Sequence, residues 1–204
     1  VALGKLADGQ TAPVLVAVLS DQQEEIFVRV AAATALGQLE SADAEGPLLD
    51  ALASRPPAPA PAEDDEDQPV ADDTTRSLRV AAASALARLQ STQVIVGLRE
   101  AANETEETAP AVRVAATYAL GDLSTYSDDE KALSEAIEGL LAACGDSTGD
   151  VRIAAVQSLG RVQLIPKVLE AGVSRALTNA EQDAHFWVRQ AAVEARRSLG
   201  PLDV

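Results

Sequence analysis

The sequence has few of the residue types from which catalytic and metal sites are built. Its 204 residues include one cysteine, one histidine and no methionine. A single cysteine excludes an intrachain disulfide and a cysteine-based zinc site. Because it follows the apolar run Leu-Leu-Ala-Ala, we expect Cys144 to be a small core residue. The single histidine, His185, stands beside Phe186 and Trp187 at a predicted turn, where we expect a surface or capping role and not catalysis.

Aromatic residues and long apolar runs are also scarce. Aromatic residues make up 2% of the chain, although 47% of its residues are hydrophobic. The core must therefore consist of Ala, Leu, Val and Ile, which favours closely packed helices over a β-sandwich. No apolar run reaches the roughly 18 residues that a membrane span needs, and no signal peptide is visible. The sequence therefore predicts a cytoplasmic protein.

Basic residues are half as numerous as acidic residues in this sequence. The chain has 32 Asp and Glu against 16 Lys and Arg, which gives a formal net charge of −16. Proteins that bind nucleic acids neutralise phosphates with Lys and Arg, so an acidic chain is a poor candidate for binding DNA, RNA or anionic lipid. The charge instead predicts a protein or peptide partner that is basic.

The common motifs of catalysis are missing from the sequence. It contains no G-x-S-x-G motif, no P-loop and no dinucleotide-binding fingerprint. Its many carboxylates fall on predicted turns and exposed faces, and no acid–base pair stands out. We therefore predict that the chain is not an enzyme and has no catalytic residue, no metal site and no cofactor.

Alanine is abundant, and it occurs in a motif that repeats along the chain. The motif Val-Arg-Val-Ala-Ala or a close variant occurs at 28–32, 78–82, 112–116, 151–155 and 188–192. Leu-Gly or Leu-Ala follows at a fixed offset in the first four copies, and Arg196-Arg197 takes its place in the last. After the first gap, the motif arginines are 34, 39 and 37 positions apart, which is typical of a two-helix repeat.

A second helical pattern precedes each alanine-rich motif. Its leucines, valines and isoleucines recur at i, i+3, i+4 and i+7, as in Leu133, Ile137, Leu140 and Leu141. The small residues of the motif allow the second helix of a unit to approach its neighbours closely. One unit cannot bury both of its faces, so stability must come from stacking. The pattern predicts an all-α fold, an α-solenoid.

The pattern V-R-x-A-A-x-x-A-L-G-x-L resembles HEAT-like repeats of the type found in phycobilisome lyases. The resemblance implies a single domain, 1–204, of about five stacked two-helix repeats, with a partial repeat at 1–6. In that family the repeated arginine pairs with acidic residues of adjacent turns. The arginines of the resulting ladder would be Arg29, Arg79, Arg113, Arg152 and Arg189. The expected acids are Glu24 or Glu25 for Arg29, Asp150 for Arg152 and Asp183 for Arg189; anion binding is the alternative role.

Residues 55–76 form an insertion within one repeat. The segment contains five prolines and the acidic run Glu63–Asp67, which oppose a continuous helix and favour disorder. It falls between a first helix and a second helix, so we expect a loop. The loop is either inert or a docking segment for a basic partner or for cations.

Two sets of residues are candidates for partner binding. Phe27 and Trp187 stand at equivalent positions, and they either pack on the preceding repeat or form exposed anchors. The second set occupies positions six and ten after each motif valine, and its residue types vary from repeat to repeat. Either a partner-binding surface or ordinary solvent exposure would produce this variation. Its members are Thr34, Gln38, Ser84, Arg88, Tyr118, Asp122, Gln157, Arg161, Glu194 and Ser198.

Three functions are compatible with these features. The first is a non-enzymatic scaffold or adaptor that binds a partner protein or peptide on a curved, acidic surface. The second, implied by the resemblance alone, is a bilin-lyase-like enzyme subunit that handles a linear tetrapyrrole. The third is a structural segment of a larger solenoid, for which we expect an exposed apolar end at 1–6.

Overall fold

The described part of the chain forms five helix pairs. A computed structural model describes residues 11–55, 75–89, 91, 93–103, 105, 107, 109–126 and 129–200. These residues contain ten α-helices, two short 3-10 helices and no strand, which confirms the all-α class. The first helices of the pairs are α1 (Thr11–Ser20), α3 (Glu45–Ala53), α5 (Val94–Ala102), α7 (Glu130–Ala143) and α9 (Lys167–Ala180). The second helices are α2 (Ile26–Leu39), α4 (Arg76–Leu86), α6 (Pro110–Tyr126), α8 (Gly149–Leu159) and α10 (Phe186–Leu199).

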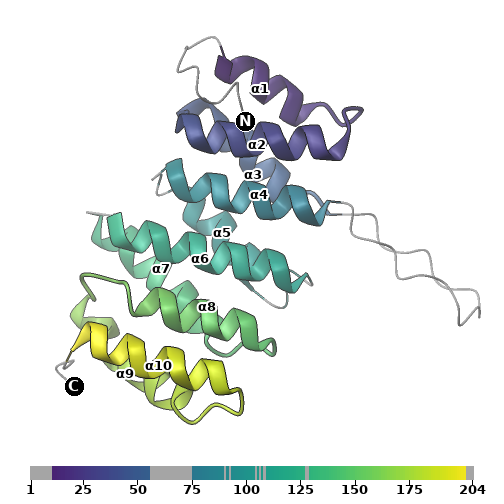
Figure 1. The fold of residues 1–204 in the computed structure, drawn as a ribbon. Coiled ribbons are helices and arrows are strands. Elements are labelled where there is room, and N and C mark those ends of the chain that lie inside the picture. The colour runs from purple at the N-terminus through teal and green to yellow at the C-terminus, as the bar shows by residue number, and fades with distance from the viewer. Residues whose placement is uncertain are drawn as a thin grey trace, which may run out of the picture.

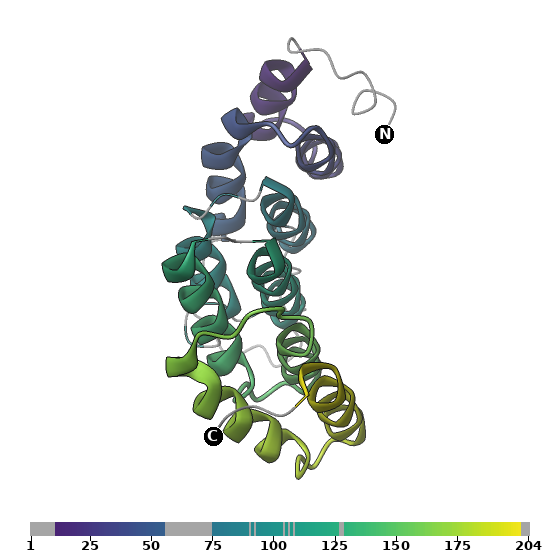
Figure 2. The ribbon, with the colours of Figure 1, turned by 90° about the vertical axis from the view of Figure 1, so that its left-hand side faces the viewer.

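The pairs stack side by side into two layers, so the predicted α-solenoid is confirmed (Figure 1). Each second helix packs on the second helix of the next pair, and the first helices form the other layer. Seen after a turn of 90° about the vertical axis, the stack is bent, with the second helices on its concave side and the first helices on its convex side (Figure 2). The second helices are the more closely packed layer, which explains why the stack bends toward them.

Small residues permit this close approach of the second helices. A Cβ added to Gly37 of α2 would lie 2.7 Å from Ala85 Cα of α4. One added to Gly160, the C-cap of α8, would lie 2.7 Å from Ala195 Cα of α10. Any larger side chain at these positions would push the neighbouring backbone away. The alanines and glycines of the motif therefore set the spacing between repeats.

The core lies between the two layers and consists almost entirely of aliphatic side chains. The motif leucines are fully buried: Leu36, Leu86, Leu120 and Leu159 each have 0% exposure. Fully burying a leucine contributes about 1.5–3 kcal/mol, so these four positions contribute substantially to the stability of the stack. In the last pair Arg196 stands at this position, and its Nε donates to Glu181 Oε1 at 2.6 Å.

Helix ends agree with the sequence pattern in part. Asp129 is the N-cap of α7 and accepts hydrogen bonds from two backbone N–H groups of the first turn. Helix α8 starts at Gly149, two residues before the motif valine Val151. Asp150 therefore lies within the first turn, where a carboxylate interacts favourably with the helix dipole. Helix α10 ends at Leu199, and the following Gly200 adopts φ 71°, a conformation that favours glycine.

Two predicted features lie outside the described residues. These are the partial repeat at 1–6 and the larger part of the insertion, residues 56–74. The insertion joins α3 to α4, as expected, because α3 ends at Ala53 and α4 begins at Arg76. The disordered loop, the exposed apolar N-terminal end and the single domain 1–204 stay predictions.

Candidate interaction surface

A row of arginines connects successive repeats at the loops between first and second helices. Arg113 of α6 binds both carboxylate oxygens of Asp146, with Nε–Oδ2 2.7 Å and Nη2–Oδ1 3.0 Å. Arg152 of α8 binds Asp183 in the same way, at 2.7 and 2.8 Å. Arg79 of α4 donates from Nη1 to the carboxylate of Glu107. In each case the acid belongs to the loop of the following repeat, so these pairs hold neighbouring repeats together.

The opposite edges of the Arg113 and Arg152 guanidinium groups bind the loops that precede their own helices. Nη1 of Arg113 donates to the carbonyl oxygen of Glu107 at 3.0 Å, and Nη1 of Arg152 donates to that of Asp146 at 2.9 Å. Each acid also accepts a backbone N–H two residues later, for example His185 N to Asp183 Oδ1 at 2.7 Å. Every acid is thus fixed by its own turn and by the preceding repeat. The result is a continuous hydrogen-bonded chain from α4 to α10.

The acidic partners differ from those that the sequence predicted. Asp150 does not pair with Arg152, which binds Asp183 instead. Asp183 gives Arg189 only its backbone carbonyl oxygen, at 2.6 Å. Arg29 donates from Nε to the carbonyl oxygen of Leu19 at 2.9 Å, and no ion pair with Glu24 or Glu25 is present in the described part of the chain.

The carboxylate of Asp183 is electrostatically stabilised. The hydrogen bond from Arg152 is the largest cause of a lowered pKa at Asp183, and the backbone N–H of His185 adds to it. The same pair raises the pKa of Arg152. The Arg79–Glu107 and Arg113–Asp146 pairs are almost fully buried, with side-chain exposures of 2–3%. These contacts belong to the interior of the stack and leave little surface for an outside ligand.

The concave face is the exposed surface of the second helices and of the turns that directly follow α4 and α8. It comprises four positions per helix, all half-buried or exposed: 27, 30, 34, 38; 77, 80, 84, 88; 111, 114, 118, 122; 150, 153, 157, 161; and 187, 190, 194, 198. Only three of these residues are acidic (Asp122, Asp150 and Glu194), and two are arginines (Arg88 and Arg161). The curved surface is therefore nearly neutral, although the whole chain carries −16. The prediction of an acidic curved surface was wrong for this face.

Polar side chains connect α6 and α8 across the concave face. Tyr118 donates its hydroxyl to Gln157 Oε1 at 2.7 Å. Arg161 lies 3.3 Å from Asp122 Oδ1, and its guanidinium carbon is 5.9 Å from the centre of the Tyr118 ring. Both members of the ion pair are about half exposed, so it contributes little to stability. These four residues form an ordered polar patch in the middle of the stack.

Next to this patch, the surface between α8 and α10 is hollowed. One hollow of about 460 Å³ is lined by Ile153, Trp187, Gln190 and other side chains. A second, of about 280 Å³, lies between Tyr118, Arg161 and Glu194. Both hollows share Gln157, Ala191 and Glu194, so they form one groove, which we call the α8/α10 groove. It combines an exposed aromatic ring with polar groups, which is the composition of many binding sites.

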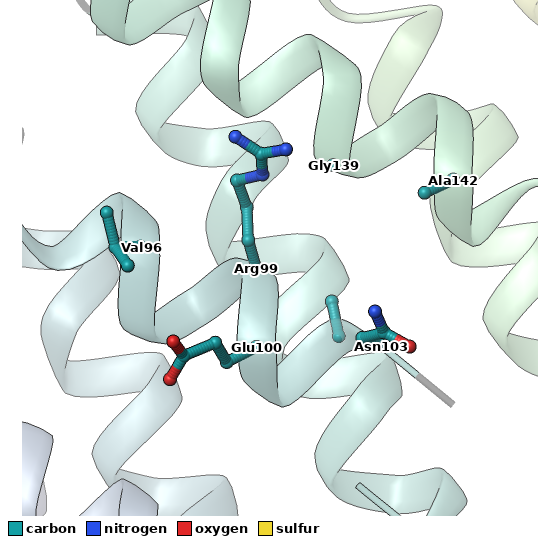
Figure 3. A pocket seen from close by; sticks show the side chains of 7 residues that line it. Val96, Arg99, Glu100, Asn103, Gly139 and Ala142 are labelled. Atoms are coloured by element: carbon teal, nitrogen blue, oxygen red, sulfur yellow. The ribbon is translucent and has the colours of Figure 1, made fainter. Parts of the chain in front are cut away.

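A larger hollow, of about 540 Å³, lies on the convex side between α5 and α7. Figure 3 shows Arg99 of α5 extending toward α7 at Gly139, with Glu100 and Asn103 on the same side of the hollow. A Cβ at Gly139 would meet Arg99 Cγ at 3.0 Å, so the glycine provides the space for this side chain. Arg99 makes a long ion pair with Glu138, at 3.6 Å. The described residues that line it include no aromatic side chain, unlike those of the α8/α10 groove.

Two family models match this chain. Residues 68–160 match the model of HEAT repeats, and residues 28–54 match that of the PBS lyase HEAT-like repeat. The chain is a HEAT-like repeat protein of the phycobilisome-lyase type. No curated protein matches this HEAT-like sequence.

Several solved structures share the fold of this HEAT-like protein. One is the complex of CpcE and CpcF of phycocyanin lyase from a Nostoc species, with 25% identity, coverage of 93% of this chain and 99% of that chain, and a TM-score of 0.65. Another is a computationally designed armadillo repeat protein for modular peptide recognition, with 19% identity, 98% and 91% coverage and a TM-score of 0.63. A third is a designed armadillo repeat protein in complex with the peptide (KR)4, with 17% identity, 98% and 90% coverage and a TM-score of 0.64. The two armadillo proteins show the fold alone.

The predicted binding residues of the HEAT-like protein fall into distinct groups. Tyr118, Asp122, Gln157, Arg161 and Glu194 come together at the polar patch and the α8/α10 groove. Ser198 also lines the groove. Further toward the N-terminus the concave face has no such cluster among the described residues. Its predicted members there are Thr34, Gln38, Ser84 and Arg88, which are exposed.

The two predicted aromatic anchors are both exposed. Phe27 is 65% exposed and Trp187 is 63% exposed, so neither ring is buried against the preceding repeat. Trp187 lines the α8/α10 groove and stacks edge-on against Phe186, with 5.0 Å between the ring centres. Sequence reasoning missed Ile153 and Gln190 as groove residues. Their position two after the motif valine, which is half-buried or exposed in every second helix, could have identified them.

Few features of the described residues bear on metal binding, thiol reactivity or membrane insertion. The described residues contain no group of three or more His, Cys, Asp and Glu side chains that could bind a metal ion. Burial raises the pKa of the Cys144 thiol to about 12, so it is protonated at neutral pH. No described helix has both the length and the apolar character that a membrane-spanning segment needs.

Proposed function

We propose that this HEAT-like protein is a non-enzymatic scaffold that binds a partner protein or peptide on its concave face, with the α8/α10 groove as the main contact. The observation that carries the proposal is the groove itself, in which Trp187 is exposed beside an ordered polar patch. Aromatic residues next to a hollow are frequent hot spots of protein interfaces. The similarity to a complex of two lyase chains and to designed peptide-binding proteins supports a polypeptide partner.

The partner is basic overall, because a chain of net charge −16 attracts positive charge at long range. The concave face carries only three carboxylates, so contacts there are mainly apolar and polar. The negative charge outside this face speeds the approach of the partner, and the groove determines how tightly it is held. Seven of the acidic residues fall within 56–74 of the insertion.

Trp187→Ala and Phe27→Ala make a matched test, because both rings are exposed to the same extent at equivalent positions. Partners that co-purify with the wild-type protein are quantified by mass spectrometry for both variants. We expect Trp187→Ala to lose the partner by about tenfold or more, as for hot-spot residues, and Phe27→Ala to retain it. If both variants retain the partner, or lose it equally, the groove is not the contact site.

The basic character of the partner is tested with the peptide (KR)4, labelled for fluorescence anisotropy. We expect binding that weakens as salt is raised, because the attraction between exposed charges is screened. A neutral peptide of equal length is the control. Absence of binding, or binding that does not respond to salt, would contradict the basic partner and leave the groove proposal in place.

A bilin-lyase-like subunit is the second candidate function. It is favoured by one observation, the 25% identity to the phycocyanin lyase complex over 93% of this chain. In that case the protein would bind a linear tetrapyrrole, together with a second subunit. Mixing the protein with phycocyanobilin should then change the absorbance spectrum of the pigment. An unchanged spectrum, with and without a candidate second subunit, would remove this function.

A further inference from the structure

Three described aromatic residues line the α8/α10 groove, and two of their rings already have an arginine beside them. The guanidinium carbon of Arg161 lies 5.9 Å from the centre of the Tyr118 ring. That of Arg189 lies 5.7 Å from the centre of the Phe186 ring. No described side chain places a cation over Trp187, although an indole attracts cations more strongly than the other two ring types.

We propose that the groove binds a cationic side chain of the partner polypeptide, a lysine or an arginine, with its stem on Trp187 and its charged group at Glu194. The inference rests on the proposed function, since it specifies what the same groove recognises. Long-range attraction by the acidic chain would bring a basic partner close without selecting any one of its residues. The groove would make that selection.

Glu194 is placed to receive the charged group. Among the described residues that line the groove it is the only acid, and it lines both hollows. Another concave carboxylate, Asp122, is paired with Arg161, whereas Glu194 has no ion pair with a described residue. It stands seven residues after Trp187, which is two helical turns, so both side chains project from the same face of α10. A cation in the groove can therefore contact an indole ring and a carboxylate together.

The rest of the hollow around Trp187 suits a long side chain with a charged end. Ile153 and Ala191 provide apolar contacts for the methylene groups of lysine or arginine. The side-chain amide of Gln190 offers an oxygen that can accept a hydrogen bond from either cation. A purely apolar occupant would remove water from the Glu194 carboxylate without replacing its hydrogen bonds, which is unfavourable.

The negative charge of the concave face is concentrated around the groove. The concave positions of α6, α8 and α10 carry three carboxylates and one arginine, a net charge of −2, whereas those of α2 and α4 carry one arginine and no acid. Arg189 is fixed beside Phe186 by the carbonyl oxygens of Asp183 and Ala184, at 2.6 and 3.0 Å. Its charge opposes a second cation at Phe186, so the favourable position is on Trp187, toward Glu194.

The exposure of Trp187 and Glu194 is a property of the concave face. Helices α4, α6 and α8 each have second helices packed on both sides. The residues at the position of Trp187 in these helices are all exposed: Ser77, Ala111 and Asp150. Those at the position of Glu194 are exposed or half-buried: Ser84, Tyr118 and Gln157. Packing on either side of a second helix therefore leaves both positions accessible from the concave side.

Trp187 is the only tryptophan of the chain, so its indole N–H resonance reports directly on the groove. Blocked pentapeptides with one central lysine among alanines, or with norleucine in its place, are titrated into the ¹⁵N-labelled protein. Norleucine keeps the apolar stem and lacks the ammonium group. We expect the lysine peptide to shift the indole resonance and to bind about fivefold more tightly than the norleucine peptide. An arginine peptide and its neutral citrulline counterpart repeat the comparison for a guanidinium.

Glu194→Gln and Asp150→Asn are matched variants. Each removes one negative charge from an exposed position of the concave face, but only Glu194 lines the groove. We expect Glu194→Gln to reduce the preference for the cationic peptides to less than about twofold, and Asp150→Asn to keep most of it. Glu194→Lys should bind the norleucine peptide more tightly than the lysine peptide. Circular dichroism checks that all three variants are folded. An equal loss of preference in Glu194→Gln and Asp150→Asn would mean that only the overall charge acts, and the proposal would be wrong.

The outcomes separate this inference from the proposed function. If neither cationic peptide binds more tightly than its neutral counterpart, or the indole resonance does not move at about 50 mM peptide, the cationic contact is refuted. Loss of the co-purifying partner in Trp187→Ala would then still identify the groove as the contact site. Retention of that partner in Trp187→Ala would refute both proposals, because the partner would not be bound through the groove.

Discussion

Gly37 determines how closely α2 and α4 approach, and replacing it with alanine tests the packing on which the bent stack depends. The new Cβ would lie 2.7 Å from Ala85 Cα and 2.8 Å from Ala85 Cβ. Ordinary van der Waals contact begins at 3.4 Å, so the two helices would have to separate by about 0.7 Å. No side-chain rotation can avoid the contact, because it involves a backbone atom, the Cα of Ala85 in α4.

Two effects of this substitution oppose each other. Over-packing of a tight core costs about 1–3 kcal/mol. Removing a glycine from a helix stabilises it by about 0.5–1 kcal/mol. The first effect is larger, so we expect Gly37→Ala to lower the free energy of unfolding by about 1–2 kcal/mol. Gly46→Ala in α3 is the matched control, because its added Cβ meets nothing within 4 Å and only the stabilising effect remains.

The free energies are measured by urea denaturation, followed by far-ultraviolet circular dichroism. Gly160→Ala repeats the test at the other end of the stack, where the added Cβ meets Ala195 Cα at the same 2.7 Å. The two close-contact variants should be destabilised, and Gly46→Ala should be stabilised. If Gly37→Ala proves as stable as Gly46→Ala, the second helices are not in close contact, and the explanation of the curvature is refuted.

Three further predictions concern the ion pairs and the cysteine. Asp146→Asn breaks an almost fully buried pair and should cost about 3–5 kcal/mol in urea denaturation, whereas Asp122→Asn, in a half-exposed pair, should cost less than about 1 kcal/mol. The hydrogen bond from Arg152 lowers the pKa of Asp183 in the folded state. The Asp183 carboxylate therefore stabilises the fold above the unfolded pKa, near 4, and this contribution is lost as the pH falls through the lower folded pKa. The Asp183→Asn variant should show a smaller slope of unfolding free energy against pH in that range. Burial raises the pKa of the Cys144 thiol to about 12, so it should react with a thiol reagent at pH 8 only slowly until the protein is unfolded.

The fold was predictable because its determinants are local and repeated. The spacing of apolar residues identified both helices of each pair, and the fixed Leu-Gly position identified the buried contact. Leu36 and Leu159 are buried at 0% exposure, as the pattern requires. Helix starts were less certain, since α8 begins two residues before Val151. The energies that decide the first turn are small and depend on the loop that precedes it.

The partners of the arginines were not predictable from the nearest acid. Arg152 binds Asp183, which lies 31 residues further on, and forms no ion pair with Asp150, two residues away, in the described structure. Asp150 lies in the first turn of α8 itself, whereas the guanidinium of Arg152 extends across to the loop of the next repeat. A better indicator was present in the sequence. An acid stands six residues before each of the last three motif arginines, at Glu107, Asp146 and Asp183.

Total charge was a poor guide to the interaction surface, because charge is distributed unevenly between the two layers and the loops. The sequence gives −16 for the chain, but the concave face combines three carboxylates with two arginines. The repeat itself explains this. Its concave positions face the crowded side of the bend, where like charges on adjacent helices would repel each other at short range. Carboxylates therefore accumulate where they are spread out in solvent or paired with an arginine. An interaction surface of this protein is better recognised from its aromatic and unpaired groups, such as Trp187, than from the sum of its charges.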